Sequence, residues 1–198
     1  MKFFSAQTIA NSNAPNQRWS MPIRLTMPRP LPIQAPVVAP IISQEPKKTM
    51  KWGEPTWFLF HTLSVKIIDS EFQKIRTDLL NRIYAICTNL PCPDCANHAK
   101  AYLDGLNFNT IQTKEDLKHM LHTFHNVVNK RKGYPQFPYE ELDEKYSKAI
   151  TTNIIRNFMA HFSDRNRSIK LLATDLHRAR LCEVLKVWFN TNIVYFKP

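Results

Sequence analysis

Two cysteines separated by two residues, in Cys92-Pro93-Asp94-Cys95, form the sharpest local feature of this sequence. Thiols at this spacing at the start of a helix can close a small, reducible disulfide, and the free N–H groups of the first turn stabilise the thiolate of the leading sulfur. Pro93 at the first helical position loses no hydrogen bond, because that N–H would have been unpaired in any case. The motif therefore predicts redox-active dithiol chemistry.

Three other readings of the same cysteines stay open. Cys87, Cys92, Cys95 and His98 supply four acceptable zinc ligands within twelve residues, although along one helix the imidazole rotates away from the first thiolate. With distant Cys182, the spacing also matches a plant-type iron–sulfur cluster, whose ligands belong on a loop of a sheet protein rather than on periodic helices. The third reading is structural: two buried free thiols or a static disulfide. We expect Cys87 itself to be a small buried apolar residue.

Two further clusters combine flat rings with polar groups. Residues 52–61 hold four aromatic side chains and a histidine, and residues 122–130 place a histidine and two asparagines on one helical face. Polar amides and imidazoles in the middle of an amphipathic helix are costly unless they have partners, so a bound polar ligand is a natural account. Each cluster alone is more readily structural, but the rings also suit stacking on a planar heterocycle.

The elements that must position these clusters follow from helical periodicity, which begins at Trp52. Four amphipathic helices with short links are predicted, the pattern of an antiparallel bundle, and no alternating run is long enough for a sheet. They are expected to begin near Pro55, Phe72, Pro93 and Thr113, and the last ends in a basic turn at residues 130–132 followed by Gly133. Beyond Pro138, we expect one helix through Leu142, Tyr146, Ile150, Ile154 and Phe158, and a last one with Ile169, Leu172, Leu176, Leu185 and Trp188 inward.

Composition excludes several classes of protein. The 198 residues are 43% apolar, which suits one domain with tails, and no stretch approaches the roughly 18 uncharged apolar residues of a spanning helix. A membrane-spanning or exported protein is therefore disfavoured, and no transmembrane segment is expected. The chain has three glycines, too few for the glycine-rich loops of Rossmann dehydrogenases, kinases or P-loop enzymes.

The net charge of +11 resides in the two ends of the chain. Residues 1–50 carry six basic residues and one acid, residues 51–150 carry thirteen and twelve, and residues 151–198 carry eight and three. Eight of the fourteen prolines also fall in the first fifty residues, where they prevent a continuous helix or strand. We therefore predict a basic, proline-rich extended arm over residues 1–48 and a basic helical extension over residues 149–198. Such ends suit an acidic partner, a membrane surface or nucleic acid, so a nucleic-acid-binding scaffold is an alternative function.

Taken together, the motifs resemble the Erv/ALR family of FAD-linked sulfhydryl oxidases. The resemblance rests, in order, on Trp52-Gly-x3-Trp57-x3-His61, Cys92-x2-Cys95-x2-His98, His125-Asn126-x-Val128-Asn129 and Gly133-x-Pro135-x-Phe137. It implies an all-α fold, a four-helix bundle with a short fifth helix, as a domain over residues 49–148. It also implies FAD at the mouth of the bundle and a homodimer. The residues that would surround FAD are Trp52, Gly53, Trp57, His61, His98, His125, Asn126, Val128, Asn129 and Lys132, with Tyr146 near the adenine end.

The same resemblance implies a mechanism. A substrate thiolate attacks Cys92, Cys95 faces the flavin, and electrons pass through FAD to oxygen to give hydrogen peroxide. The implied partners are protein dithiols or a small, thioredoxin-like redox protein. The chain lacks the extra structural cysteines of cellular members and a second cysteine pair in either tail, and in this it resembles the short forms of large cytoplasmic DNA viruses. We therefore expect the host cytoplasm or the virion as its location, with the mitochondrial intermembrane space as the alternative.

Overall fold

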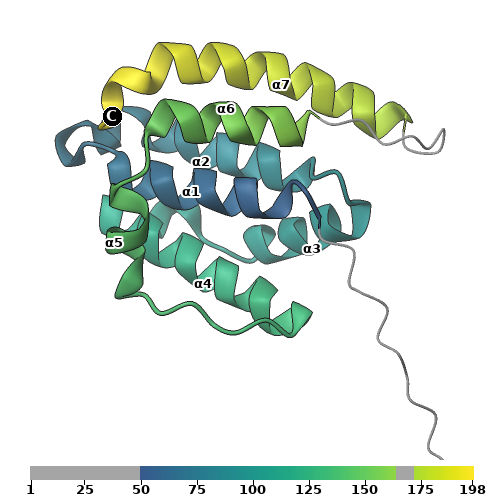
Figure 1. Cartoon of the computed structure of the whole chain (residues 1–198), viewed down its shortest axis with the longest axis horizontal. Helices are drawn as coiled ribbons and strands as arrows, with labels where there is room; N and C mark the ends of the chain where they lie inside the picture. The colour runs from purple at the N-terminus through teal and green to yellow at the C-terminus, as the bar shows by residue number, and fades with distance from the viewer. Residues whose placement is uncertain (1–49, 164–171) are drawn as a thin grey trace, which may run out of the picture. The chain divides into compact units, whose positions relative to one another are not determined.

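The computed structural model describes residues 50–163 and 172–198, and this part of the chain folds into seven α-helices without strands (Figure 1). The predicted all-α class is confirmed. The predicted arm over residues 1–48 and Ile169 of the predicted last helix lie outside the described residues. The helices are α1 (Gly53–Lys66), α2 (Phe72–Thr88), α3 (Pro93–Asp104), α4 (Lys114–Lys132), α5 (Glu141–Ser147), α6 (Thr151–Phe162) and α7 (Leu172–Asn192). Short 3-10 turns cover Asp69–Glu71, Phe108–Thr110 and Ile193–Tyr195.

The ends of α3 and α4 are set by local hydrogen bonds. Thr113 and Asp116 form a capping box at the start of α4: the Thr113 hydroxyl accepts from the Asp116 N–H at 3.0 Å, and the Asp116 carboxylate accepts from the Thr113 N–H at 2.8 Å. Gly133 ends α4 with a φ of 70°, a left-handed conformation that glycine adopts without strain. Cys92 is the N-cap of α3 and Pro93 is its first residue, as predicted.

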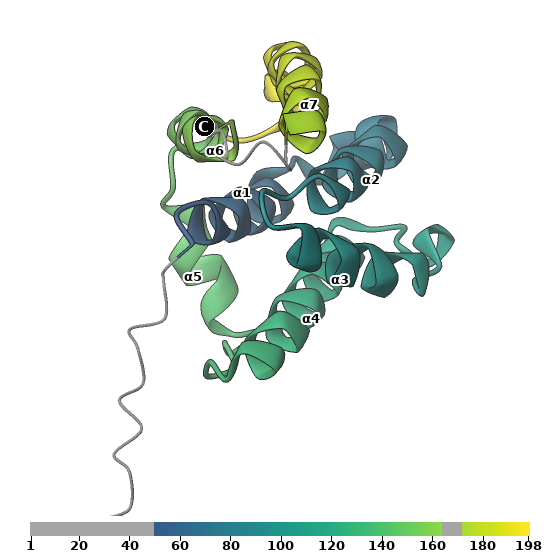
Figure 2. The same ribbon diagram turned by 90° about the vertical axis from the view of Figure 1, so that its right-hand side faces the viewer.

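One hydrophobic core joins the four-helix bundle to the C-terminal helices. Helix α6 packs most closely against α1, and α7 packs against α2 and α6 (Figures 1 and 2). The core therefore continues from the bundle into the predicted extension, and the described residues belong to one compact unit. Its buried side chains include Leu59 and Leu63 of α1, Leu79 and Ile83 of α2, Leu117 and Leu121 of α4, Phe158 and Phe162 of α6, and Leu185 and Phe189 of α7.

The end of α7 is attached to the end of α1 by backbone hydrogen bonds. Ile67 and Phe196 form an isolated antiparallel bridge, and the Lys197 N–H donates to the Lys66 carbonyl at 2.8 Å. The Thr151 hydroxyl at the start of α6 donates to the Lys197 carbonyl at 2.6 Å. These hydrogen bonds connect the start of α6 and the residues after α7 to the end of α1.

The prediction of one helix from Leu142 to Phe158 is wrong, because the chain breaks between α5 and α6, whereas the short fifth helix that the family resemblance implies is present as α5. Ile150 is extended, with φ −85° and ψ 110°, and its side chain is 56% exposed rather than buried. Both α5 and α6 pack against α1, which one continuous helix could not do from the two sides where they lie (Figure 2). Packing on α1 therefore overrides the local helical pattern.

The predicted inward face of the last helix is also partly wrong. Leu185 and Trp188 are buried as expected, but Leu172 and Leu176 are 58% and 57% exposed. The face that the first turns of α7 bury carries an ion pair, Asp175 and Arg178, whose carboxylate oxygen and guanidinium nitrogen lie 2.5 Å apart. The buried stripe of α7 runs through Asp175, Arg178, Cys182, Leu185, Trp188 and Phe189. A charged pair can replace apolar side chains in a core when each charge has its partner.

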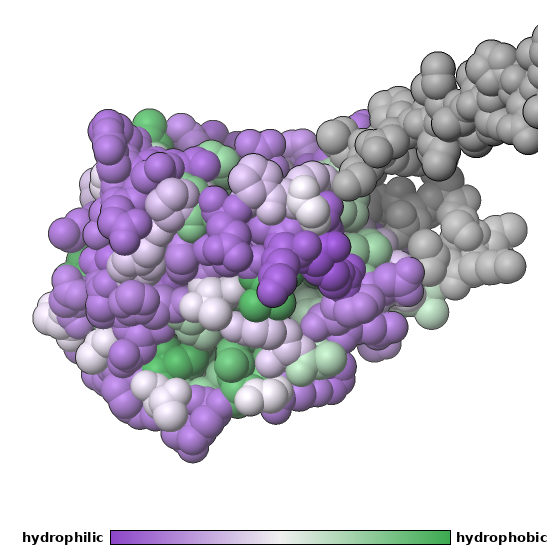
Figure 3. Space-filling view, turned by 90° about the horizontal axis from the view of Figure 1, so that it is seen from below, coloured by the Kyte–Doolittle hydropathy of each residue, from purple (hydrophilic) through white to green (hydrophobic). Residues whose placement is uncertain are grey.

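The surface shown in Figure 3, on the side of α4 in Figure 1, is mostly hydrophilic and holds small groups of hydrophobic residues. Within the described part of the chain, every helix is either too short or too polar to cross a bilayer. Helices α1, α3 and α4 enclose the cavity that Cys95 lines.

Candidate active site

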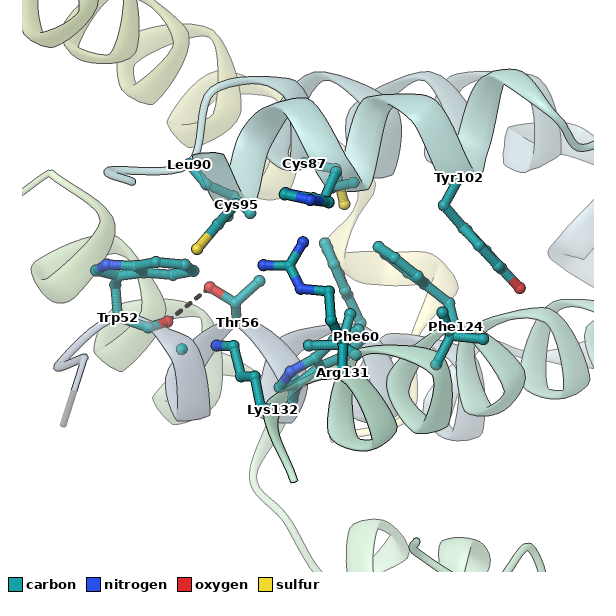
Figure 4. A pocket seen from close by; sticks show the side chains of 16 residues that line it. Trp52, Thr56, Phe60, Cys87, Leu90, Cys95, Tyr102, Phe124, Arg131 and Lys132 are labelled. Carbon is teal, nitrogen blue, oxygen red and sulfur yellow. Dashed lines mark hydrogen bonds between the residues drawn. The ribbon is translucent and has the colours of Figure 1, made fainter. Parts of the chain in front are cut away.

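A cavity of about 140 Å³ lies between α1, α3 and α4, and Cys95 lines its wall (Figure 4). In Figure 4, the Cys95 sulfur points toward the Trp52 ring, and the Arg131 guanidinium reaches from α4 into the cavity. Five aromatic side chains make the lining mainly apolar: Trp52, Trp57, Phe60, Tyr102 and Phe124. An apolar lining rich in aromatic side chains suits a flat organic ligand.

The dithiol is presented to this cavity by the first turn of α3. The Cys95 N–H donates to the Cys92 sulfur at 3.2 Å, so a free helix N-terminal donor favours negative charge on the leading sulfur. Cys95 lines the cavity, whereas Cys92 does not. Burial, and to a lesser extent the hydrogen bond with Cys92, raises the pKa of the Cys95 thiol to about 11, and the charges of Lys132 and Arg131 act in the opposite direction.

A second cavity, of about 300 Å³, adjoins the first and is more polar. The two share Gly53, Trp57, Val128 and Lys132 in their linings. The remaining side chains of the second lining include polar, aromatic and charged groups: Glu54, Phe58, His125, Asn129, Tyr134, Lys145 and Tyr146. Two lysines against one glutamate suit a ligand that carries negative charge.

A stack of rings lies in and behind the wall of the second cavity. Trp57 lies against His125, with ring centroids 4.1 Å apart and planes at 12°. His125 Nδ1 lies 2.9 Å from Nε2 of His61, whose ring is 4.9 Å from that of Tyr146. Burial is the main cause that lowers the pKa of His61 to about 3 and that of His125 to about 4, so both rings are neutral at pH 7.

Comparison with known proteins identifies the domain that carries this site. Residues 54–147 match the Erv1 / Alr family. Over this stretch the chain is similar to that family. The predicted resemblance is confirmed, and the matched stretch ends at residue 147, before helices α6 and α7.

Curated relatives carry names that agree with this family. FAD-linked sulfhydryl oxidase ERV1 of rice (Oryza sativa subsp. japonica) is 31% identical over 98 residues, which cover 48% of this chain and 49% of the rice protein. The FAD-linked sulfhydryl oxidase of African swine fever virus (isolate Tick/Malawi/Lil 20-1/1983) is 29% identical over 105 residues, 53% of this chain and 87% of the viral protein. FAD-linked sulfhydryl oxidase ERV1 of Arabidopsis thaliana is 28% identical over 96 residues, which cover 48% of this chain and 50% of the Arabidopsis protein. The chain thus spans about half the length of the plant relatives, and no solved structure matches it.

The fold brings most of the predicted cofactor residues together. Nine of the eleven line one or both cavities, whereas His61 and Asn126 line neither. His61 is fully buried behind His125. The nine are Trp52, Gly53, Trp57, His98, His125, Val128, Asn129, Lys132 and Tyr146.

Asn126 holds the segment that follows α4 instead of facing a cavity. Its amide oxygen accepts from the Phe137 N–H at 2.9 Å, and its amide nitrogen donates to the Phe137 carbonyl at 3.0 Å. The same carbonyl lies 2.7 Å from His122 Nε2. His125 and Asn126 on this face of α4 therefore have protein partners, whereas the sequence pattern alone assigned both to a ligand.

Two cationic residues of the site were not predicted as site residues. Lys145 lines the polar cavity, and its ammonium lies 4.9 Å from the centre of the Phe137 ring and 5.6 Å from that of Tyr146. Arg131 lines the apolar cavity, whereas the sequence showed it only as part of a basic last helical turn. In the sequence, Lys145 and Arg131 each stand next to a predicted cofactor residue, Tyr146 and Lys132. This position alone does not show that their side chains reach a cavity.

The described residues contain no group of three or more histidine, cysteine or acidic side chains arranged to hold a metal ion. Cys87, Cys92, Cys95 and His98 accordingly do not converge. Cys87 is buried, as predicted, and burial raises the pKa of its thiol far above the ordinary range. The zinc and iron–sulfur alternatives are not favoured.

Proposed function

We propose that this chain is an FAD-linked sulfhydryl oxidase that forms disulfide bonds in proteins, with Cys92 and Cys95 as its redox pair. The observation that carries the proposal is the position of Cys95 in the wall of an aromatic cavity that adjoins a polar, cationic one. Similarity to the Erv1/Alr family and the names of the relatives support the activity and the cofactor.

The residues of the two cavities fit FAD in chemical character. The aromatic cavity suits a flat, weakly polar ring system, and its opening onto Cys95 suits the half of the cofactor that exchanges electrons. The polar cavity, with Lys132, Lys145 and Asn129, suits a pyrophosphate and its sugars. Bound there, FAD would supply a two-electron acceptor for the dithiol and deliver the electrons to oxygen, which gives hydrogen peroxide.

The two cysteines divide the work on the substrate. A substrate thiolate attacks the Cys92 sulfur of the Cys92–Cys95 disulfide; the bond between the two cysteines breaks, a mixed disulfide forms, and Cys95 leaves as the thiolate. A second substrate thiolate then attacks the substrate sulfur of the mixed disulfide, which releases Cys92 and leaves the substrate oxidised by two electrons. The helix N-terminal N–H at Cys92 stabilises the charge that this sulfur carries on release.

The cavity wall controls the proton on Cys95. Because burial raises the pKa of this thiol to about 11, the reduced residue holds its proton at neutral pH. Electrons leave Cys95 only as the proton is lost, and the charges of Arg131 and Lys132 lower the free energy of that loss. These two side chains therefore assist the step in which Cys95 is reoxidised.

The partners and the location follow the same proposal. We expect protein dithiols or a small, thioredoxin-like protein as substrates, a homodimer, and an acidic partner for the basic ends of the chain. Relatives from a large DNA virus support the host cytoplasm or the virion as the location, and the plant relatives keep the mitochondrial intermembrane space as the alternative.

Absorption spectroscopy and oxygen consumption test the proposal on the purified chain. It should show a flavin spectrum and consume oxygen with a dithiol substrate. Cys92→Ser and Cys95→Ser should each abolish turnover while the flavin stays bound. Cys182→Ala is the matched control, since Cys182 is buried on α7 and lines neither cavity, and it should keep its turnover. A colourless protein, or full activity in Cys95→Ser, would refute the assignment.

A further inference from the structure

Two neutral histidines share one hydrogen bond behind the polar cavity. His61 on α1 is fully buried, and its Nε2 lies 2.9 Å from Nδ1 of His125 on α4. The other ring nitrogen of His61, Nδ1, is buried and has no hydrogen-bond partner among the residues that the structure describes. His125 lines the polar cavity, so its Nε2 is the ring nitrogen left for a ligand.

The unpartnered nitrogen decides which ring donates. A neutral imidazole carries one N–H and one lone pair, so one of the two rings must donate and the other accept. If His61 carried its proton on Nδ1, a buried N–H would be orphaned, which folded proteins avoid more strictly than a bare acceptor. His61 therefore carries its proton on Nε2 and donates to His125. Because His125 accepts at Nδ1, its own proton is on Nε2.

We propose that His61 is a positioning residue that fixes the tautomer of His125, so that His125 presents an Nε2–H donor to the polar cavity. Trp57 supports this arrangement, because the stacked indole holds the imidazole in one orientation. The inference rests on the proposed function only in naming the acceptor, which would be an oxygen or nitrogen atom of bound FAD. A donor at this place complements Lys132 and Lys145, since all three groups suit an acceptor-rich, anionic ligand.

The neutrality of both rings makes the tautomer meaningful. Burial is the main cause that lowers the pKa of each ring, and the charge of Lys145 lowers both further. At pH 7 neither ring therefore carries a second proton that would make it a donor at both nitrogens.

NMR spectra of the purified chain, labelled with ¹⁵N in histidine, read the tautomer directly from long-range ¹H–¹⁵N couplings. The proposal predicts the Nε2–H form for both His61 and His125 at pH 7, with and without added FAD. An Nδ1–H form of His125 would overturn it. If the chain binds no FAD, the proposed function fails, and these spectra still decide the tautomer.

Three variants separate this role from a merely structural one. His61→Leu removes the donor, so His125 should become a mixture of both tautomers and the dissociation constant for FAD should rise about tenfold. His61→Gln restores an N–H donor and should keep the Nε2–H form, with an affinity within about threefold of the parent chain. Thr62→Val is the matched control, a buried neighbour on α1 whose hydroxyl has no partner, and should change neither readout.

The outcomes that contradict the inference are specific. A pure Nε2–H form of His125 in His61→Leu would show that His61 does not fix the tautomer. An equal loss of FAD affinity in His61→Gln and His61→Leu would show that the imidazole ring matters for packing and that its N–H donor does not. If His61→Leu does not fold, the spectra of the parent chain and of His61→Gln decide.

Discussion

Replacing Asn126 with alanine removes the side chain that joins α4 to residue 137. The amide makes two hydrogen bonds to the Phe137 backbone, at 2.9 and 3.0 Å, in a partly buried position. Each such bond contributes about 1 kcal/mol net, and up to about twice that when its partner is left unpaired away from water. We therefore expect Asn126→Ala to lower the free energy of unfolding by about 2–4 kcal/mol. For a domain of this size, that corresponds to a fall in Tm of roughly 4–16 °C.

Urea and thermal unfolding, with and without FAD, measure this effect. Asn153→Ala is the matched control, because the exposed Asn153 side chain accepts a hydrogen bond from the exposed Arg156. The free energy of unfolding of this variant should stay within about 0.5 kcal/mol of that of the parent chain. The reasoning fails if Asn126→Ala leaves the flavin-free chain as stable as before and abolishes FAD binding. In that case Asn126 is a ligand of the cofactor, as the sequence predicted.

Two further predictions concern pH and charge. His61 and His125 have pKa values of about 3 and about 4 in the fold, against about 6.5 when unfolded. Below pH 6.5 the unfolded chain therefore binds more protons than the folded one, so the free energy of unfolding is highest above pH 6.5 and decreases as the pH falls toward 4. We expect the free energy of unfolding, measured by urea denaturation, to fall by up to about 1.4 kcal/mol per pH unit for each histidine as the pH is lowered. A free energy of unfolding that stays constant between pH 7 and 5 would contradict this. Arg131→Gln should raise the pKa of Cys95 and slow anaerobic flavin reduction by a dithiol about threefold at pH 7, with less effect at high pH. Lys130→Gln, in the same turn but outside both linings, is the control, and equal pH profiles for the two variants would count against the role of Arg131.

The features that could be predicted from the sequence are those decided within a few residues. Cys92 and Pro93 begin α3, Thr113 begins α4 and Gly133 ends it, because helix ends are decided by which nearby groups satisfy the free backbone N–H and C=O groups. Periodicity also predicted the four helices of the bundle, since α2, α3 and α4 each bury one face. Helix α1 is buried on all sides from Leu59 to Lys66. The spacing of the motifs was also enough to indicate the family and its dithiol.

The tertiary structure decided which way each polar side chain faces and what it meets. His125 and Asn126 are neighbours on α4, yet one lines a cavity and the other bonds to Phe137, because the segment after Gly133 folds back beside α4. Leu172 and Leu176 were expected inside, but the face of α7 that the fold buries carries an ion pair instead. Distant contacts of this kind leave no periodic trace in a sequence, since they depend on which element packs against which. The sequence alone thus determined the four helices of the bundle and the kind of chemistry, and packing determined the break between α5 and α6 and which side chains reach the cavities.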